Sequence, residues 1–113
     1  MAKNKVDGEP DYKLVVWPFL KGPMQRIVLP NWLAITIGKR IYSWRKLDDA
    51  ELAHELTHVK QWRRHGLAFP LHYWSASRSA SRSGGDRYRD NQFEREAHET
   101  EAVVKKKMDE RRA

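Results

Sequence analysis

The sequence contains no cysteine, so neither disulfide bonds nor thiolate metal ligands can be part of this protein. Any metal site must therefore be built from histidine, aspartate or glutamate. No run of about 18 consecutive apolar residues occurs, so we expect no membrane-spanning segment. Residues 1–10 are polar, lack the apolar stretch of a signal peptide and are expected to form a flexible tail. These absences favour a cytoplasmic protein.

The length and composition of the chain suit one folded domain. The chain has 113 residues, of which 40% are hydrophobic, and its five tryptophans are expected mainly in the core. No internal repeat and no domain boundary is visible, so residues 11–113 are expected to form a single domain.

The net charge of +7 favours acidic partners in principle. The basic residues are spread along the chain among acids, and only Lys105–Lys107 and Arg111–Arg112 cluster, beside Asp109 and Glu110. A solvated surface is the favoured interpretation of this pattern, and a polyanion-binding site is the alternative.

The first part of the domain, residues 11–44, has the pattern of short strands. Gly38 and Lys39 suit a tight hairpin turn, and prolines at 18, 23 and 30 confine the earlier runs to short or edge strands. We predict a small antiparallel sheet whose strands lie within residues 14–17, 25–29, 33–37 and 40–44.

Residues 47–65 have the pattern of a helix. Asp48 is a good N-cap with Glu51 three residues later, and Gly66 is a natural terminator. One apolar stripe follows Leu52, Leu56, Val59 and Trp62 or Arg63, and a separate polar stripe follows His54, His58, Gln61 and His65. The helix thus has one face for the core and one for chemistry.

The rest of the chain is predicted to be mostly helical. Residues 67–74 suit a short helix or packed turn, and residues 75–85, rich in Ser, Arg and Gly, suit a mobile loop. From 86 to about 111 we expect a long helix whose buried side carries Phe93, Ala97, Val104 and Met108. The predicted fold class is therefore α+β.

The polar stripe contains the pentapeptide His54-Glu55-Leu56-Thr57-His58, an HExxH motif. Histidines four residues apart on a helix share one face, so both rings can bind one zinc ion while Glu55 reaches a water molecule on that ion as general base. The plain alternative is a surface helix that happens to carry two histidines.

A catalytic zinc site needs a third protein ligand. A metzincin would have glycine at 61 and histidine at 64, where this chain has Gln61 and Arg64, so that class is excluded. His65 lies about two turns beyond His58, too far to share its ion. The other candidates that the sequence leaves open are His72, Glu94, Glu96 and His98.

Two segments together resemble a known family. They are Leu52–Trp62, LAHELTHVKQW, and Asn91–His98, NQFEREAH. They resemble the short gluzincin-type metallopeptidases, the HExxH-plus-Glu zincins of bacterial and phage proteins. In that family a second helix carries a pattern similar to N-P-F-E-x-E-A. The segment Ile35–Trp44 also resembles the family's strand pair, so the resemblance covers about residues 33 to 100.

The resemblance implies zinc bound by His54, His58 and Glu94, with Glu55 as the general base of peptide-bond hydrolysis. It implies a protein or peptide substrate. The family often has an aspartate at the position of His98, which hydrogen-bonds a ligand histidine, so His98 is a candidate for that supporting role. Glu96 should point away from Glu94 and is expected to be a surface or structural residue.

Other roles stay open from sequence alone. The run Arg40–Trp44 is either an open strand edge for a peptide or an ordinary packed strand. Donors to a reaction oxyanion could be Tyr73, Tyr88, His98 or nearby arginines. The alternative function is a basic module that binds nucleic acid or an acidic protein, with a structural or vestigial metal site. Its contacts would be the terminal lysines and the arginines Arg78, Arg82, Arg87 and Arg89.

Overall fold

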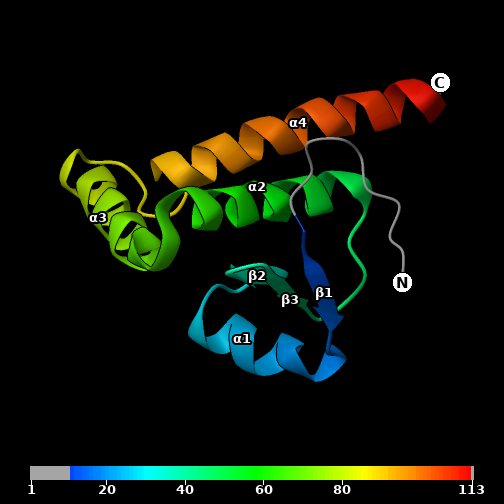
Figure 1. Cartoon of the computed structure of the whole chain (residues 1–113), viewed down its shortest axis with the longest axis horizontal. Helices are drawn as coiled ribbons and strands as arrows, with labels where there is room; N and C mark the ends of the chain where they lie inside the picture. The colour runs from blue at the N-terminus through cyan, green and yellow to red at the C-terminus, as the bar shows by residue number, and fades with distance from the viewer. Residues whose placement is uncertain (1–10, 113) are drawn as a thin grey trace.

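The computed structural model describes residues 11–112, and its architecture is α+β, as predicted. Figure 1 shows a small sheet with two long helices, α2 and α4, side by side on one side of it and the short helix α1 on the other. Helix α3 lies beyond one end of the long pair. Among the described residues no helix is both long and apolar enough to cross a membrane. The predicted tail, residues 1–10, lies outside the described residues.

The sheet has three strands, β1 (Lys13–Val16), β2 (Ala34–Ile37) and β3 (Arg40–Ser43), in the order β1-β3-β2. Strands β2 and β3 form the predicted hairpin, with Gly38 at a φ of 65° in its turn. The prediction of an antiparallel sheet is wrong in one respect, because β1 pairs with β3 in parallel. The chain between β1 and β2 crosses the sheet, so β3 occupies the central position and β2 an edge.

One predicted strand is a helix. The run 25–29 falls largely within α1 (Lys21–Ile27), which follows a 3-10 turn, η1 (Pro18–Leu20). Pro23 is in the first turn of α1, where a missing N–H removes no helical hydrogen bond. The Gln25 side chain donates to the Trp32 carbonyl at 3.1 Å and ties this helix to the segment before β2.

Helix α2 (Asp49–His65) carries the HExxH motif and begins as predicted. Asp48 accepts from the Glu51 N–H at 2.8 Å, and Glu51 accepts from the Asp48 N–H at 3.0 Å, which completes a capping box. Gly66 ends the helix with a φ of 64°. The apolar stripe of α2 packs on the sheet, where Leu56 and Val59 form a core cluster with Ile41.

The predicted mobile loop 75–85 is helical for most of its length. After a second 3-10 turn, η2 (Gly66–Ala68), helix α3 runs from Phe69 to Arg82. Asn91, which is fully buried, donates from its amide nitrogen to the Tyr73 carbonyl at 3.1 Å and to the Ser77 hydroxyl at 2.8 Å. These tertiary hydrogen bonds hold the serine-rich helix against the body of the protein.

Helix α4 (Gln92–Arg112) begins six residues later than predicted. Asp86 accepts from the N–H groups of Tyr88 and Arg89, both at 2.8 Å, and holds the preceding residues in turns. Phe93 and Ala97 are buried as predicted. Val104 and Met108, also predicted on the buried side, are only partly covered.

The tryptophans are divided between core and surface. Trp32 is buried, whereas Trp44 and Trp62 are half-buried and donate from their indole nitrogens to the carbonyls of Trp32 and Thr36. Trp17 and Trp74 are exposed. The expectation of a tryptophan core therefore holds for only part of the set.

Candidate metal centre

The polar stripe of α2 is covered by α4, which runs antiparallel to it. His58 meets Glu94 near the start of α4, and His54 meets Glu101 two turns further along. His54 and His58 are buried under α4, and Glu55, whose carboxylate meets Thr36 on β2, is buried as well. Burying three ionisable side chains is unfavourable unless each has partners, so their contacts decide what the cluster can do.

Both histidines point the same ring atom at one carboxylate oxygen. The Nε2 atoms of His54 and His58 each lie 3.2 Å from Oε1 of Glu94. Glu94 itself is buried. The two histidines of the motif and the glutamate that the resemblance implied as third ligand therefore meet at one point between α2 and α4.

This donor set suits zinc. Zinc bonds of about 2.0–2.2 Å in tetrahedral geometry separate neighbouring ligand atoms by about 3.3–3.5 Å. The two nitrogen–oxygen separations of 3.2 Å are close to that spacing. Two imidazoles and one carboxylate are also the ligand types of open, catalytic zinc sites rather than of closed structural ones.

The far ring nitrogens are held by acceptors. Nδ1 of His54 lies 2.8 Å from Oε1 of Glu101, and an ionised carboxylate can only accept, so Nδ1 donates. Nδ1 of His58 lies 2.8 Å from Oε1 of Gln61. In neutral rings these bonds place the proton on Nδ1 and leave the lone pair of Nε2 available to a metal.

The orientation of Gln61 follows from its other contacts. Its amide nitrogen lies 3.0 Å from the Phe93 carbonyl and 2.8 Å from Oε1 of Glu96, both of which accept. The amide oxygen must therefore face His58. Glu96 supports the site from outside through this fully buried glutamine, which agrees with the structural role predicted for it.

The charges of the cluster shift the pKa values of its histidines and its glutamate in opposite directions. Burial alone would lower the pKa of His54, but hydrogen bonding to Glu94 and the charges of Glu55 and Glu94 outweigh burial and raise that pKa to about 9. The pKa of His58 is raised for similar reasons. Burial opposes the charge of Glu94, yet its hydrogen bonds to both histidines bring its pKa well below the usual range.

Glu55 is fixed from the sheet side. The Thr36 hydroxyl on β2 donates to Oε1 of Glu55 at 2.8 Å. Burial raises the pKa of Glu55, against the opposing charges of His58 and His54. A carboxylate whose pKa is raised toward neutrality is a better proton acceptor for catalysis at neutral pH than an ordinary glutamate.

Tyr73 on α3 reaches the second oxygen of Glu94. Its hydroxyl donates to Oε2 at 2.5 Å, which leaves Oε1 to face the histidines. Burial, with the adjacent charge of Glu94, raises the pKa of Tyr73, so its phenol remains a donor. This contact gives Tyr73 a role in orienting Glu94, whereas the sequence suggested it only as an oxyanion donor.

His98 lies beside this cluster and could replace His58 in an alternative metal site with His54 and Glu94. Its ring packs edge-on against that of His54 at 4.6 Å, and ligand atoms of His54, Glu94 and His98 all lie within 4.8 Å of one another. His58 is the better ligand, because it is buried, is anchored by Gln61 and shares Oε1 of Glu94 at 3.2 Å. The side chain of His98 is 46% exposed, and its Nδ1 lies 3.4 Å from Glu101.

The cluster opens into a cleft of about 770 Å³ between β2, α2, α3 and the start of α4. Its lining includes Glu55, Tyr73, Arg87, Tyr88 and the chain from 28 to 37 except Pro30. The open strand edge proposed for Arg40–Trp44 is not there, since β3 pairs on both sides, and β2 lines the cleft instead.

The other candidate residues lie elsewhere in the described structure. The rings of His65 and His72 pack against each other at 5.0 Å, and neither residue lines the cleft. The side chains of Arg78, Arg82 and Arg89 are exposed, and that of Arg87 is at the cleft.

Sequence reasoning missed the supporting roles of Thr36, Gln61 and Glu101. Gln61 carried a signal, because it follows His58 by three residues on the same stripe. Glu101 carried a weaker one, because it follows Glu94 by two helical turns. The supporting bond to a ligand histidine, for which His98 was the candidate, is made by Glu101 to His54.

Three comparisons with known proteins gave no relative. No protein-family model, no curated protein and no solved structure matches this chain. The function therefore has to be argued from the geometry of the cluster.

Proposed function

We propose that this protein is a zinc-dependent metallopeptidase. The observation that carries the proposal is the convergence of His54 Nε2 and His58 Nε2 on one oxygen of Glu94. The resemblance of the two helical segments to short gluzincins supports the same ligand set. The proposed ligands are His54, His58 and Glu94, with zinc as the cofactor and a peptide as the substrate.

Zinc bound there would supply a Lewis acid that polarises a peptide carbonyl and makes a water molecule acidic near neutral pH. Glu55 lines the same cleft and is held by Thr36 through one oxygen. In this proposal Glu55 would accept a proton from that water and return it to the leaving amine. Tyr73 and Glu101 keep the ligands oriented during this exchange.

The substrate would enter along β2. This strand is at the edge of the sheet and lines the cleft, so its outer backbone groups can pair with an extended peptide. Apolar side chains from both walls, including Ile35, Trp62 and Phe69, favour substrates with apolar residues near the cleaved bond.

The test compares the wild type with Glu55→Gln. After zinc loading and removal of excess metal, both should retain about one zinc per chain, because Glu55 is not a ligand. Only the wild type should cleave a denatured protein substrate, with cleavage sites read by mass spectrometry. Rates should fall at least about 100-fold, the usual contribution of a general base.

Glu99→Gln is the matched control. It makes the same chemical change at Glu99, a residue that is exposed on α4. It should cleave at the wild-type rate. The proposal fails if the purified protein takes up no divalent metal, or if Glu55→Gln cleaves as fast as the wild type.

A further inference from the structure

Helix α3 presents an unusual outer face. Leu71, Trp74, Arg78 and Arg82 follow one another at helical spacing, and Leu67 in η2 continues the row in the other direction. The opposite side of the helix carries Phe69 and Tyr73 toward the body of the protein. We call the row from Leu67 to Arg82 the α3 stripe.

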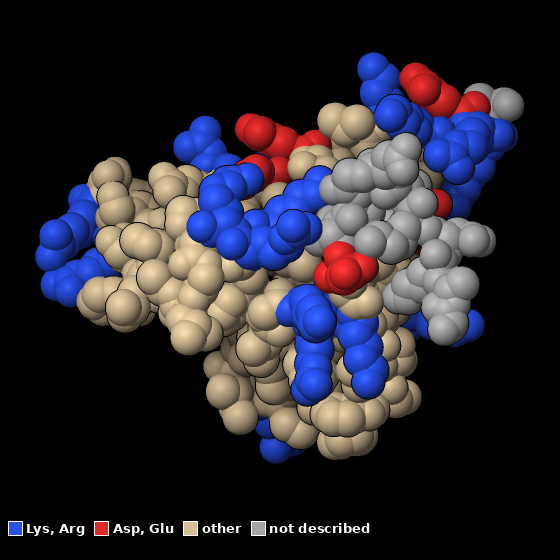
Figure 2. Space-filling view, in the orientation of Figure 1, with Lys and Arg blue, Asp and Glu red and all other residues tan. Residues whose placement is uncertain are grey.

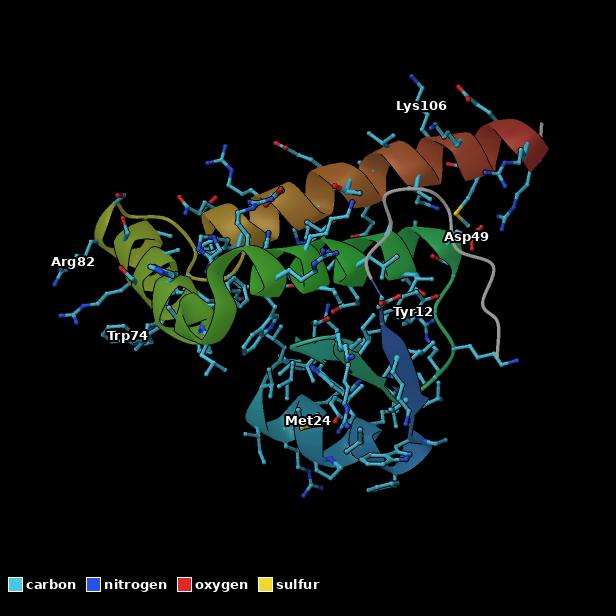
Figure 3. The ribbon with its side chains drawn as sticks, in the orientation of Figure 1. Tyr12, Met24, Asp49, Trp74, Arg82 and Lys106 are labelled. Carbon is cyan, nitrogen blue, oxygen red and sulfur yellow. The ribbon has the colours of Figure 1, made fainter. Side chains whose placement is uncertain are left out.

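The large side chains of the stripe are uncovered. Leu67 is 94% exposed, Leu71 71% and Trp74 52%. Figure 3 shows Trp74 and Arg82 projecting from α3 away from the long helices. Exposed apolar residues are common singly, but a leucine–leucine–tryptophan row on one helix face is typical of an interaction surface.

The charged residues of the stripe itself, Arg78 and Arg82, are both basic. In the sequence no aspartate or glutamate occurs between Glu55 and Asp86, and the nearest acidic residues, Asp86 and Asp90, follow the end of α3. In Figure 2 the far end of α3 shows blue atoms with no red beside them, while blue and red are mixed at the end of α4. The stripe has an apolar half, Leu67, Leu71 and Trp74, and a basic half, Arg78 and Arg82. The two halves meet where the Arg78 guanidinium lies 5.3 Å from the centre of the Trp74 ring.

We propose that the α3 stripe binds the surface of a membrane that contains anionic lipid. The apolar half would enter the boundary between headgroups and acyl chains, and the arginines would meet lipid phosphates. Tryptophan and arginine are favoured at that boundary because each combines an apolar body with a polar or charged end. The helix lies on the bilayer and does not cross it.

Charge and chemistry favour this occupant over two others. A second copy of the chain could cover the leucines, but its own stripe offers no carboxylate to the arginines. A nucleic acid would attract the arginines, but it offers no apolar layer for Leu67 and Leu71. The lipid surface satisfies both halves of the stripe at once.

The experiment is co-sedimentation of the full chain with vesicles. The protein should bind vesicles of phosphatidylcholine mixed with phosphatidylglycerol and bind phosphatidylcholine alone much more weakly. Arg78→Gln with Arg82→Gln should weaken binding about 30-fold, at a factor of about five per cation. Leu67→Ser with Leu71→Ser should weaken it at least about 10-fold.

Matched controls are on α4. Lys105→Gln with Lys106→Gln removes the same charge, and Val103→Ser removes an exposed apolar side chain. Both should bind as the wild type does. All variants change exposed residues, and circular dichroism checks that each is folded. In the wild type, brominated lipid should quench tryptophan fluorescence, and Trp74→Phe should remove most of that quenching.

Three results would overturn the proposal. The first is no binding to the anionic vesicles at low salt. The second is equal loss of binding in the α4 control variants, which would make the effect one of net charge. The third is binding to a nucleic-acid oligonucleotide, but not to vesicles, with a steep salt dependence that the leucine variants leave unchanged.

Discussion

At the residue scale, the metal proposal depends on which histidine joins His54 and Glu94. His58→Ala should reduce zinc affinity at least about 1,000-fold, because it removes one of the three proposed ligands. His98→Ala should reduce it less than about 10-fold, because the His98 side chain is 46% exposed whereas His58 is buried. Competition with a zinc-chelating dye measures both values. The reverse order would assign the site to His54, Glu94 and His98.

Glu101 is the second residue to test, because it holds the far nitrogen of His54 at 2.8 Å. Glu101→Ala should lower zinc affinity about 10- to 100-fold, the usual effect of losing a partner that orients a ligand. Glu101→Gln keeps an acceptor and should lose less. Glu99→Ala, an exposed change on the same helix, should lose nothing measurable in the same dye assay. Equal affinities for all four proteins would show that Glu101 has no orienting role.

Some residues of this candidate site could be predicted from the sequence more directly than others. His54, Glu55 and His58 belong to one helix, so helical spacing alone places them together. Glu94 required a family resemblance. Glu101 and Thr36 depend on how α4 and β2 are offset and rotated against α2, and no local pattern encodes that relation.

At the element scale, the start of α2 is held by an ion pair as well as by its capping box. Arg45 contacts Glu51 through two hydrogen bonds of 2.9 and 2.7 Å. Hydrogen bonding to Arg45 lowers the pKa of Glu51 from its ordinary value of 4.5, against a smaller opposing effect of burial. A lowered pKa means that this stabilisation is present above pH 4.5 and is lost as pH falls through the lower folded-state value.

We therefore expect the stability difference between wild type and Glu51→Gln to depend on pH. Glutamine keeps the cap but loses the charge, so the variant should be about 0.5–1 kcal/mol less stable at pH 7. The difference should shrink as the pH falls below 4.5. Urea unfolding over a series of pH values from 7 downward measures it. In an Arg45→Gln background the pH dependence of the difference should largely disappear, and its persistence would contradict the assigned cause.

The elements that sequence predicted well are those with local signals at both ends. Asp48, Glu51 and Gly66 delimit α2 almost to the residue. The run 25–29 and the segment 75–82 had no such signals, and both are helices. Serine is a modest helix former, and α3 is held by bonds from Asn91 that exist only in the folded protein.

At the scale of the whole molecule, the proposed metal site joins α2 and α4. The proposed ligands His54 and His58 come from α2 and Glu94 from α4, so one ion would connect segments about 36 residues apart in sequence. The apolar cluster of Ile41, Leu56 and Val59 joins α2 to the sheet instead. Metal binding and folding should therefore be coupled, because the site exists only when α4 is docked.

Removal of the metal should accordingly lower thermal stability. At free zinc about 100 times the dissociation constant, binding adds about 2.7 kcal/mol to the free energy of unfolding. For a domain of this size that corresponds to a rise in Tm of roughly 10–20 °C, measured by calorimetry with zinc and with a chelator. His58→Ala should show almost no rise, whereas His72→Ala, an exposed change outside the cleft, should keep all of it. An identical Tm with zinc and with chelator in the wild type would contradict a site shared by α2 and α4.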